Sequence, residues 1–132
     1  MNRVFADTYY FFALLNRNDE AHDRAVEFSN AVDELVTTEW VLTELADGLA
    51  NSRRRDMFSK TRREMLADEY VDVVPLDMGI YEKGIQLYEN RGDKEWSLTD
   101  CISFVVMARE SITDALTGDH HFEQAGFVAL LK

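Results

Sequence analysis

The sequence predicts an α/β fold with a central, mostly parallel sheet of about five strands and helices on both faces. Short β-branched or apolar runs alternate along the chain with helical patterns of about ten residues or more, and connections of that length are typical of parallel crossovers. The 132 residues contain no linker, internal repeat or low-complexity tract. We therefore expect a single domain that spans residues 1–132.

The first half of the chain is predicted to contain two strands and four helices. In order, these are a strand at 4–6, helices at 8–16 and about 20–32, a strand at 35–37, and helices at 38–50 and about 53–69. Apolar residues at helical spacing mark the buried faces of the last two helices. They are Val41, Leu42, Leu45 and Leu49 in the first and Met57, Phe58, Met65 and Leu66 in the second.

The second half begins with a strand at 70–76, which the only proline ends at Pro75. Asp77 can cap a helix that runs to about residue 90, and 91–97 is a loop. Ser97 or Thr99 begins a helix over 98–110 that lacks a polar face and should therefore be central. A strand at 112–119, a short helix stopped by Gly126 and a last strand at 127–131 complete the chain.

Composition limits the classes of function. The chain has 14 basic and 25 acidic residues and a net charge of -11, which argues against general attraction to nucleic acid or to an anionic membrane. Cys101 is the single cysteine and cannot form an internal disulfide, so we expect it to pack as a small hydrophobe in a reducing compartment. No apolar run approaches the roughly 20 residues of a membrane span, and the start of the chain lacks a signal sequence. These features predict a cytoplasmic protein with no membrane partner.

Two aspartates follow predicted strands. Asp7 ends the first strand, and Asp119 follows the strand that ends in ALTG. Parallel sheets bind ligands beyond the carboxyl ends of their strands, so both side chains would enter one crevice if these strands are neighbours. The strand order is left open by the sequence.

Two further acids, Glu44 and Asp100, interrupt helices that otherwise carry packing residues. Asp100 could simply cap its helix. Together with Asp7 and Asp119, however, the pair completes a set of oxygen ligands that suits Mg²⁺ or Mn²⁺ and leaves room for a substrate phosphate. This is the composition of a metal-dependent phosphodiesterase site.

The stretch LTGDHHF also contains two histidines, His120 and His121. No third nitrogen or thiolate ligand lies at the spacing of a zinc site. We therefore expect Asp119 to be the metal ligand in this stretch, and His121 to cap its helix or pack beside Phe122.

Four separated segments, VFADTYYFFALLN, TEWVLTELADGLA, SLTDCISFVVMARE and LTGDHHFEQAGF, give the chain a resemblance to the PIN-domain nucleases, and specifically to the VapC-type toxin ribonucleases of toxin and antitoxin pairs. The resemblance implies a PIN-like three-layer sandwich and a catalytic, metal-binding quartet formed by Asp7, Glu44, Asp100 and Asp119. Thr8 and Thr117 would be polar neighbours of that quartet. It also implies a divalent cation, Mg²⁺ or Mn²⁺, hydrolysis of single-stranded RNA, a homodimer and a cognate antitoxin partner.

Basic residues gather in the predicted charged helix. They are Arg53, Arg54, Arg55, Lys60, Arg62 and Arg63. A solvated helix face is the simplest explanation, but in a ribonuclease the arginines could hold RNA phosphates or contact the antitoxin. Trp96 and Tyr9 could stack on bases, although core packing is the simpler expectation for both.

Two other classes of protein remain as alternatives. One is a PIN-like binding module without catalysis that acts through protein partners. The other is a phosphoacceptor receiver domain, which would need an acidic pair after the first strand, an aspartate after the central strand and a late lysine. Here Thr8 follows Asp7, Pro75 ends the run VDVV, and the late lysine is Lys132.

Overall fold

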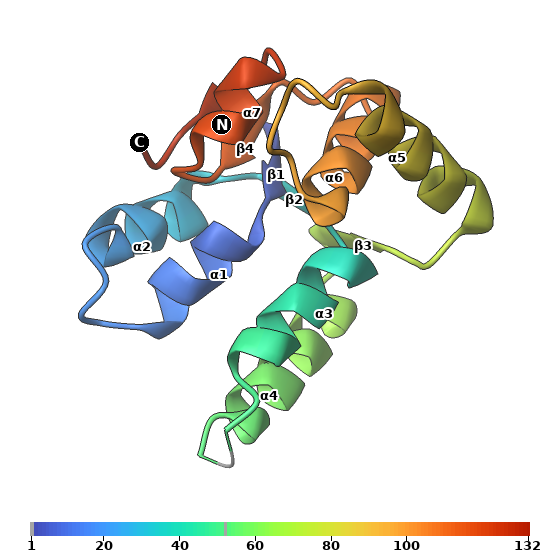
Figure 1. The fold of residues 1–132 in the computed structure, drawn as a ribbon. Coiled ribbons are helices and arrows are strands. Elements are labelled where there is room, and N and C mark those ends of the chain that lie inside the picture. Colours follow the sequence, from blue (N-terminus) through green and yellow to red (C-terminus); the bar gives the residue numbers. More distant parts are fainter. Residues whose placement is uncertain (1, 52) are drawn as a thin grey trace.

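A computed structural model of the chain describes residues 2–51 and 53–132. Within this part the structure confirms the predicted α/β class, with one five-stranded parallel sheet between layers of helices (Figure 1). The strands are β1 (Arg3–Ala6), β2 (Glu34–Thr38), β3 (Val71–Val74), β4 (Asp114–Leu116) and β5 (Val128–Ala129). The helices are α1 (Thr8–Leu15), α2 (His22–Ala31), α3 (Glu39–Gly48), α4 (Arg55–Ala67), α5 (Met78–Asn90), α6 (Leu98–Arg109) and α7 (His120–Gln124).

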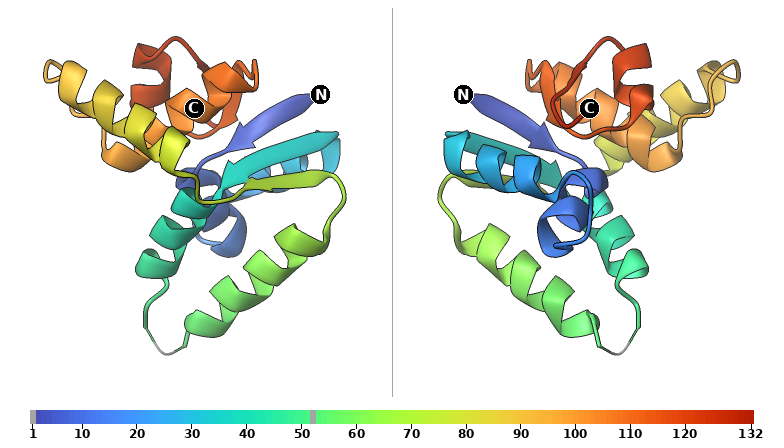
Figure 2. Two further views of the ribbon diagram at one scale, coloured as in Figure 1. Left: turned by 90° about the vertical axis from the view of Figure 1, so that its right-hand side faces the viewer. Right: turned by 90° about the vertical axis from the view of Figure 1, so that its left-hand side faces the viewer.

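The strand order is β3-β2-β1-β4-β5, which makes β1 the centre of the sheet. The chain moves outward from β1 through β2 to β3, and then returns to β4 on the other side of β1. Because parallel crossovers are right-handed, this reversal places α1 to α4 on one face of the sheet and α5 to α7 on the other. In the left view of Figure 2, α3 and α4 lie below the strands and α5 to α7 above them. The reversal falls between β1 and β4, where Phe5 pairs with Ala115 and Ala6 with Leu116.

Helix α6 is central, as its apolar sequence predicts. Cys101, Ile102, Phe104, Val106 and Met107 are all buried. Helix α5 approaches it closely at Gly84, where a Cβ atom would lie 2.5 Å from Cγ1 of Ile102. The predicted hydrophobic role of Cys101 is confirmed.

Side-chain caps set the helix starts that the sequence predicts. Asp77 accepts a hydrogen bond from the Ile80 N–H at 2.9 Å, and Ser97 accepts one from the Asp100 N–H at 3.0 Å. Gly126 follows α7 with a φ of 95°, a backbone conformation that only glycine adopts without strain.

Helices α3 and α4 form a hairpin that extends away from the sheet (Figure 1). Met57, Phe58 and Met65 of α4 are partly buried as predicted, but Leu66 is 53% exposed, so its predicted inward position is wrong. The packed strip of α4 is centred on the buried Thr61. Leu66 lies five residues further, about 140° around the helix from that strip.

Strands β4 and β5 are shorter than the predicted runs 112–119 and 127–131. The chain turns away from β4 at once, because the Thr117 N–H donates to the Ala115 carbonyl at 3.0 Å. The sheet therefore ends where the acidic residues begin. None of the helices in the described ranges is both long enough and apolar enough to cross a bilayer.

Candidate active site

All four acids of the predicted quartet line one cavity of about 360 Å³ at the carboxyl edge of β1 and β4. Asp7 follows β1, Glu44 comes from α3, Asp100 from the first turn of α6, and Asp119 precedes α7. The other lining residues are Thr8, Tyr9, Phe12, Glu95, Ser97 and His121. The cavity lies at the topological switch point of the sheet, the usual ligand site of an open α/β fold.

Thr117 ties the two strand ends together. Its hydroxyl donates to Oδ2 of Asp7 at 2.8 Å and accepts the Asp119 N–H at 3.1 Å. Asp7 is only 6% exposed. Its pKa is raised to about 7, chiefly by burial, which outweighs the hydrogen bond from Thr117; the charges of Asp100 and Glu44 contribute to the same rise.

Asp100 has two roles. Its Oδ2 accepts the Ser97 N–H at 3.1 Å, while Ser97 caps the Asp100 N–H, so the pair forms a capping box. The capping alternative from the sequence is therefore observed, and the same carboxylate also lines the cavity. Burial is the main cause that raises the pKa of Asp100, and the Asp119 charge adds to it.

Glu44 and Asp119 are more accessible than the other two acids. Oδ1 of Asp119 accepts the His121 N–H at 2.9 Å and so caps α7. Glu44 is exposed, and across residues 2–51 and 53–132 no hydrogen bond or ion pair holds its carboxylate. It is therefore free to turn toward a ligand in the cavity.

His121 was not foreseen as a site residue. Its Nδ1 lies 3.0 Å from Oδ2 of Asp100 and 3.5 Å from Oδ1 of Asp119, so its side chain faces the acids of the cavity. When the Asp100 carboxylate is ionised it can only accept, and Nδ1 then carries the proton in this contact. The Asx-type cap at Asp119 turns the next residues back over the cavity, and this local geometry is the signal that could have revealed His121.

The described residues contain one group of metal-binding side chains with donor atoms within 4.8 Å of one another, Asp119, His120 and His121. The His120 side chain is 64% exposed, and His121 already faces Asp100. The carboxylates of the quartet need not touch one another, since Mg²⁺ keeps several waters and binds through few direct carboxylate contacts.

The chemistry of the cavity fits a divalent cation. Asp7 and Asp100 have raised pKa values that a nearby positive charge would lower. The buried hydroxyl Oγ1 of Thr8, which also lines the cavity, has no hydrogen-bond partner in the part of the chain that the structure describes. Mg²⁺ and Mn²⁺ bind hard oxygen donors of this kind. Either cation would balance the negative charge of the cavity.

Tyr9 lies at the mouth of the cavity. It is 40% exposed, so the expectation of core packing is wrong for Tyr9, whereas it is confirmed for Trp96, which is 6% exposed. A Cβ atom on Gly118 would fall 2.6 Å from the Tyr9 hydroxyl. The ring therefore packs directly on the glycine backbone before Asp119, a contact that no motif in the sequence announces.

The predicted arginine patch does not reach the cavity. Arg53, Arg54 and Arg55 are exposed at the start of α4, at the far end of the α3–α4 hairpin (Figure 2). Arg62 donates to both carboxylate oxygens of Glu39, so the charge of its guanidinium is already paired. Arg63 is exposed, and none of the five lines the acidic cavity.

The histidines allow a direct test of the metal ligands. His120→Ala is expected to change Mg²⁺ affinity less than about twofold, because the side chain is solvated and Mg²⁺ prefers oxygen. His121→Ala should weaken Mg²⁺ binding several-fold by freeing the Asp100 side chain, and His121→Asn, which retains a donor near the Nδ1 position, should restore it. Isothermal titration of Mg²⁺ into the three variants would measure this, and a larger loss in His120→Ala would contradict it.

Comparison with known proteins agrees with this geometry. Residues 4–128 match the family model of the PIN domain. The chain is 27% identical to the 23S rRNA-specific endonuclease VapC20 of Mycobacterium tuberculosis (strain ATCC 25618 / H37Rv), with 95% of each chain covered. The crystal structure of M. tuberculosis VapC20, a sarcin-ricin loop cleaving toxin, superposes with a TM-score of 0.85 at 25% identity and covers 95% of this chain and 96% of that one.

Two more distant structures share the fold. FitAcB from Neisseria gonorrhoeae matches with a TM-score of 0.66 at 19% identity, over 98% of this chain and 95% of that one. VapBC2 from Rickettsia felis, bound to a promoter DNA fragment, matches with a TM-score of 0.64 at 14% identity, over 98% of this chain and 96% of that one.

Four acids converge on one cavity at the point where the strand order of the parallel sheet reverses, and this arrangement defines the class of protein. The chain belongs to the PIN domain family. It is homologous to VapC20. The receiver alternative is wrong, because a receiver sheet has the strand order 2-1-3-4-5 and this sheet has the order β3-β2-β1-β4-β5.

Proposed function

We propose that the protein is a Mg²⁺- or Mn²⁺-dependent endoribonuclease that hydrolyses phosphodiester bonds of single-stranded RNA, and that it is the toxin of a toxin and antitoxin pair. The observation that carries the proposal is the convergence of Asp7, Glu44, Asp100 and Asp119 on one cavity. The homology to VapC20, whose name gives it as a 23S rRNA-specific endonuclease, supports the RNA substrate. Such a substrate would be met in the cytoplasm.

In this proposal Asp7, Asp100 and Asp119 hold the divalent cation, assisted by the Thr8 hydroxyl. When bound, the cation would neutralise charge on the phosphate and acidify an attacking water. Thr117 keeps the Asp7 carboxylate in place through its 2.8 Å hydrogen bond. Ser97 fixes Asp100, since the Ser97 N–H engages Oδ2 and leaves Oδ1 for the cavity.

Glu44 is the candidate for positioning the attacking water. It is exposed on α3, whereas Oδ2 of Asp100 already receives the Ser97 N–H and lies 3.0 Å from His121 Nδ1. A carboxylate with free lone pairs can accept a proton from water within hydrogen-bond reach. Tyr9, exposed beside the cavity, offers a ring on which a base next to the scissile phosphate can stack.

Purified protein incubated with labelled single-stranded RNA tests the function. Cleavage is expected with Mg²⁺ or Mn²⁺ and should stop when EDTA is added. Cleavage that survives metal removal would refute the mechanism. A protein that binds its antitoxin but cuts no RNA would instead support the non-catalytic binding module.

The proposed homodimer has a candidate surface at α3 and α5. Leu76 and Met78 are 67% and 68% exposed, and they line a hollow with Trp40 and Tyr81, whose rings stack 6.5 Å apart. Large exposed apolar patches of this kind mark protein contacts. Met78→Asp is therefore expected to shift the protein from dimer to monomer in analytical ultracentrifugation. Leu66→Asp, at a leucine on α4 that is also more than half exposed, should leave the dimer intact.

The arginine patch gives a further expectation. Replacing Arg53, Arg54 and Arg55 with alanine should weaken RNA binding and reduce the slope of log affinity against log salt by up to about 2, since each phosphate contact on a single strand contributes about 0.7. Fluorescence anisotropy at several salt concentrations would measure the slope. If the slope stays unchanged while antitoxin binding is lost, the patch serves the protein partner instead.

A further inference from the structure

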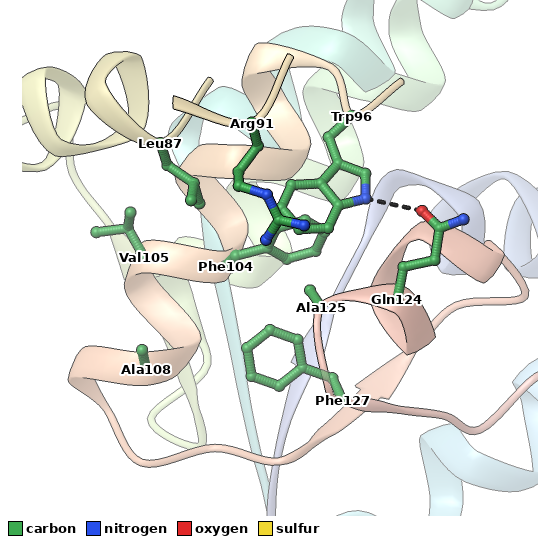
Figure 3. Close-up of a pocket in the computed structure, with 9 residues that line it drawn as sticks. All are labelled: Leu87, Arg91, Trp96, Phe104, Val105, Ala108, Gln124, Ala125 and Phe127. Carbon is green, nitrogen blue, oxygen red and sulfur yellow. Dashed lines mark hydrogen bonds between the residues drawn. The ribbon is translucent and has the colours of Figure 1, made fainter. Parts of the chain in front are cut away.

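An aromatic ring can hold an unpaired base only where its face is accessible, and Trp96 does not meet this condition. Figure 3 shows the Arg91 side chain over the Trp96 ring, with the guanidinium carbon 5.0 Å from the ring centre. The indole N–H donates to Oε1 of Gln124 at 3.0 Å, and the Phe104 ring meets the indole edge to face at 5.1 Å. Trp96 is therefore a packing residue, and the cavity that it lines contains none of the four acids.

Two other aromatic rings, those of Tyr9 and Phe12, line the acidic cavity itself. Tyr9 is 40% exposed, and Phe12 is partly exposed. Both belong to α1, the helix that begins directly after Asp7. Residues three positions apart lie on the same face of a helix, so α1 presents both rings to the cavity that Asp7 also lines.

Each of these rings packs on a glycine. A Cβ atom on Gly118 would lie 2.5 Å from Cζ of Tyr9, and one on Gly48 would lie 2.8 Å from Cε1 of Phe12. Any larger residue would displace the ring, so the missing Cβ atoms allow both close approaches. The two rings are therefore held in place from opposite directions.

The two glycines lie on opposite sides of β1. Gly118 follows β4, whereas Gly48 ends α3, the helix that follows β2. Gly48 is also about one turn beyond Glu44 on that helix. Since β1 lies between β2 and β4, the Tyr9 ring borders the cavity on the β4 side and the Phe12 ring borders it on the α3 side.

We propose that the RNA lies across α1, with the base on one side of the scissile phosphate stacked on Tyr9 and the base on the other side stacked on Phe12; the inference rests on the proposed ribonuclease function. A phosphate held among the acids carries one nucleotide on each side, and one ring borders the cavity on each side. Stacking also supplies affinity that a chain with a net charge of -11 lacks.

The arrangement selects unpaired RNA without reading its sequence. Every base has an aromatic face, so a ring accepts all four bases. In a duplex those faces are covered by the neighbouring base pairs. The substrate is therefore RNA in which both nucleotides at the cut are unstacked, as in a loop or a bulge.

Leucine substitutions test each ring separately. Tyr9→Leu and Phe12→Leu keep an apolar side chain but remove the flat face. Tyr70→Leu is the matched control, because Tyr70 is 62% exposed and precedes β3, at the end of the parallel sheet opposite the acids. Each protein is assayed for kcat and KM on short single-stranded RNAs in which one nucleotide at a time is made abasic.

Wild type and Tyr70→Leu should lose about 10-fold in kcat/KM when either base beside the cut is absent, since stacking of a single base contributes about that much. Tyr9→Leu should cleave the intact RNA about 10-fold less well, mainly through KM. It should be insensitive to the abasic site on one side of the cut and remain sensitive on the other. Phe12→Leu should show the reverse pattern.

Two outcomes would contradict the proposal in different ways. If both leucine variants keep the wild-type sensitivity on both sides, or lose it on the same side, the two-sided track fails although the ribonuclease function stands. If wild type cleaves none of the RNAs, the ribonuclease function fails and takes this inference with it.

A binding measurement keeps the test decisive if Phe12→Leu does not fold, which circular dichroism would reveal. The probe is an RNA with a non-hydrolysable methylenephosphonate at the scissile position and the fluorescent base 2-aminopurine on one side of it or the other. Wild type with Mg²⁺ should quench the fluorescence on both sides, and Tyr9→Leu should lose the quenching on one side only. Quenching on a single side in wild type, or loss on both sides in Tyr9→Leu, would overturn the assignment.

Discussion

Asp7→Asn and Asp119→Asn are each expected to lower RNA cleavage by roughly 100-fold or more, because several kcal/mol of charge stabilisation depends on the cation that these carboxylates hold. Asparagine preserves the local structure at both positions. It can still accept from Thr117 in place of Asp7, and it can still cap α7 in place of Asp119. The loss should therefore appear in turnover and in Mg²⁺ affinity, with little change in circular dichroism.

Asp114→Asn is the matched control for this experiment. Asp114 lies at the start of β4, at the opposite end of the strand from Asp119. The Asp114→Asn protein should cleave RNA at the wild-type rate. Near wild-type turnover in Asp119→Asn, measured with saturating Mg²⁺, would show that this carboxylate does not hold the cation.

The second large effect concerns stability without metal. Burial raises the pKa of Asp7 from 3.8 to about 7, so the folded protein binds a proton that the unfolded chain releases near pH 4. The free energy of unfolding should then be highest below about pH 4, fall as the pH rises, and level off above about pH 7. Asp7→Asn removes this dependence and is expected to be more stable than wild type at pH 7 in EDTA, on the order of 2 to 4 kcal/mol.

Urea unfolding at several pH values, in EDTA and with Mg²⁺, would measure this effect. Mg²⁺ at 100 times its Kd should stabilise wild type by about 2.7 kcal/mol and Asp7→Asn much less. An Asp7→Asn protein that unfolds more easily than wild type at pH 7 in EDTA would mean that the Asp7 charge supports the fold, and the cation site would lose its main electrostatic support.

Much of the fold is predictable from local sequence. The alternation of strands and helices, the cap at Asp77, the central position of α6 and the end of α7 at Gly126 depend on side chains acting on their own neighbourhood. Leu66 was mispredicted because apolar character alone does not tell which strip of α4 contacts the sheet. That strip is set by β3, which follows later in the chain.

The residue types of the acidic quartet could be predicted from the sequence. That the four side chains converge on one cavity could not be predicted without the strand order. Asp7 and Asp119 meet only because β4 returns to pair with β1, a long-range choice without a local signal. His121 and Tyr9 were missed for a related reason. The Asp119 cap turns His121 inward, and the Tyr9 ring packs on Gly118. Both positions depend on a loop geometry that exists only after the strands pair.

The pairing of β1 with β4 has a consequence for biosynthesis. Asp7 is made early, but its hydroxyl partner Thr117 lies 110 residues later in the chain, and the fourth acid comes after that. A partly synthesised chain therefore contains β1 without the neighbour that completes the acidic cavity. The proposed toxic activity therefore cannot arise before β4, Thr117 and Asp119 have been synthesised.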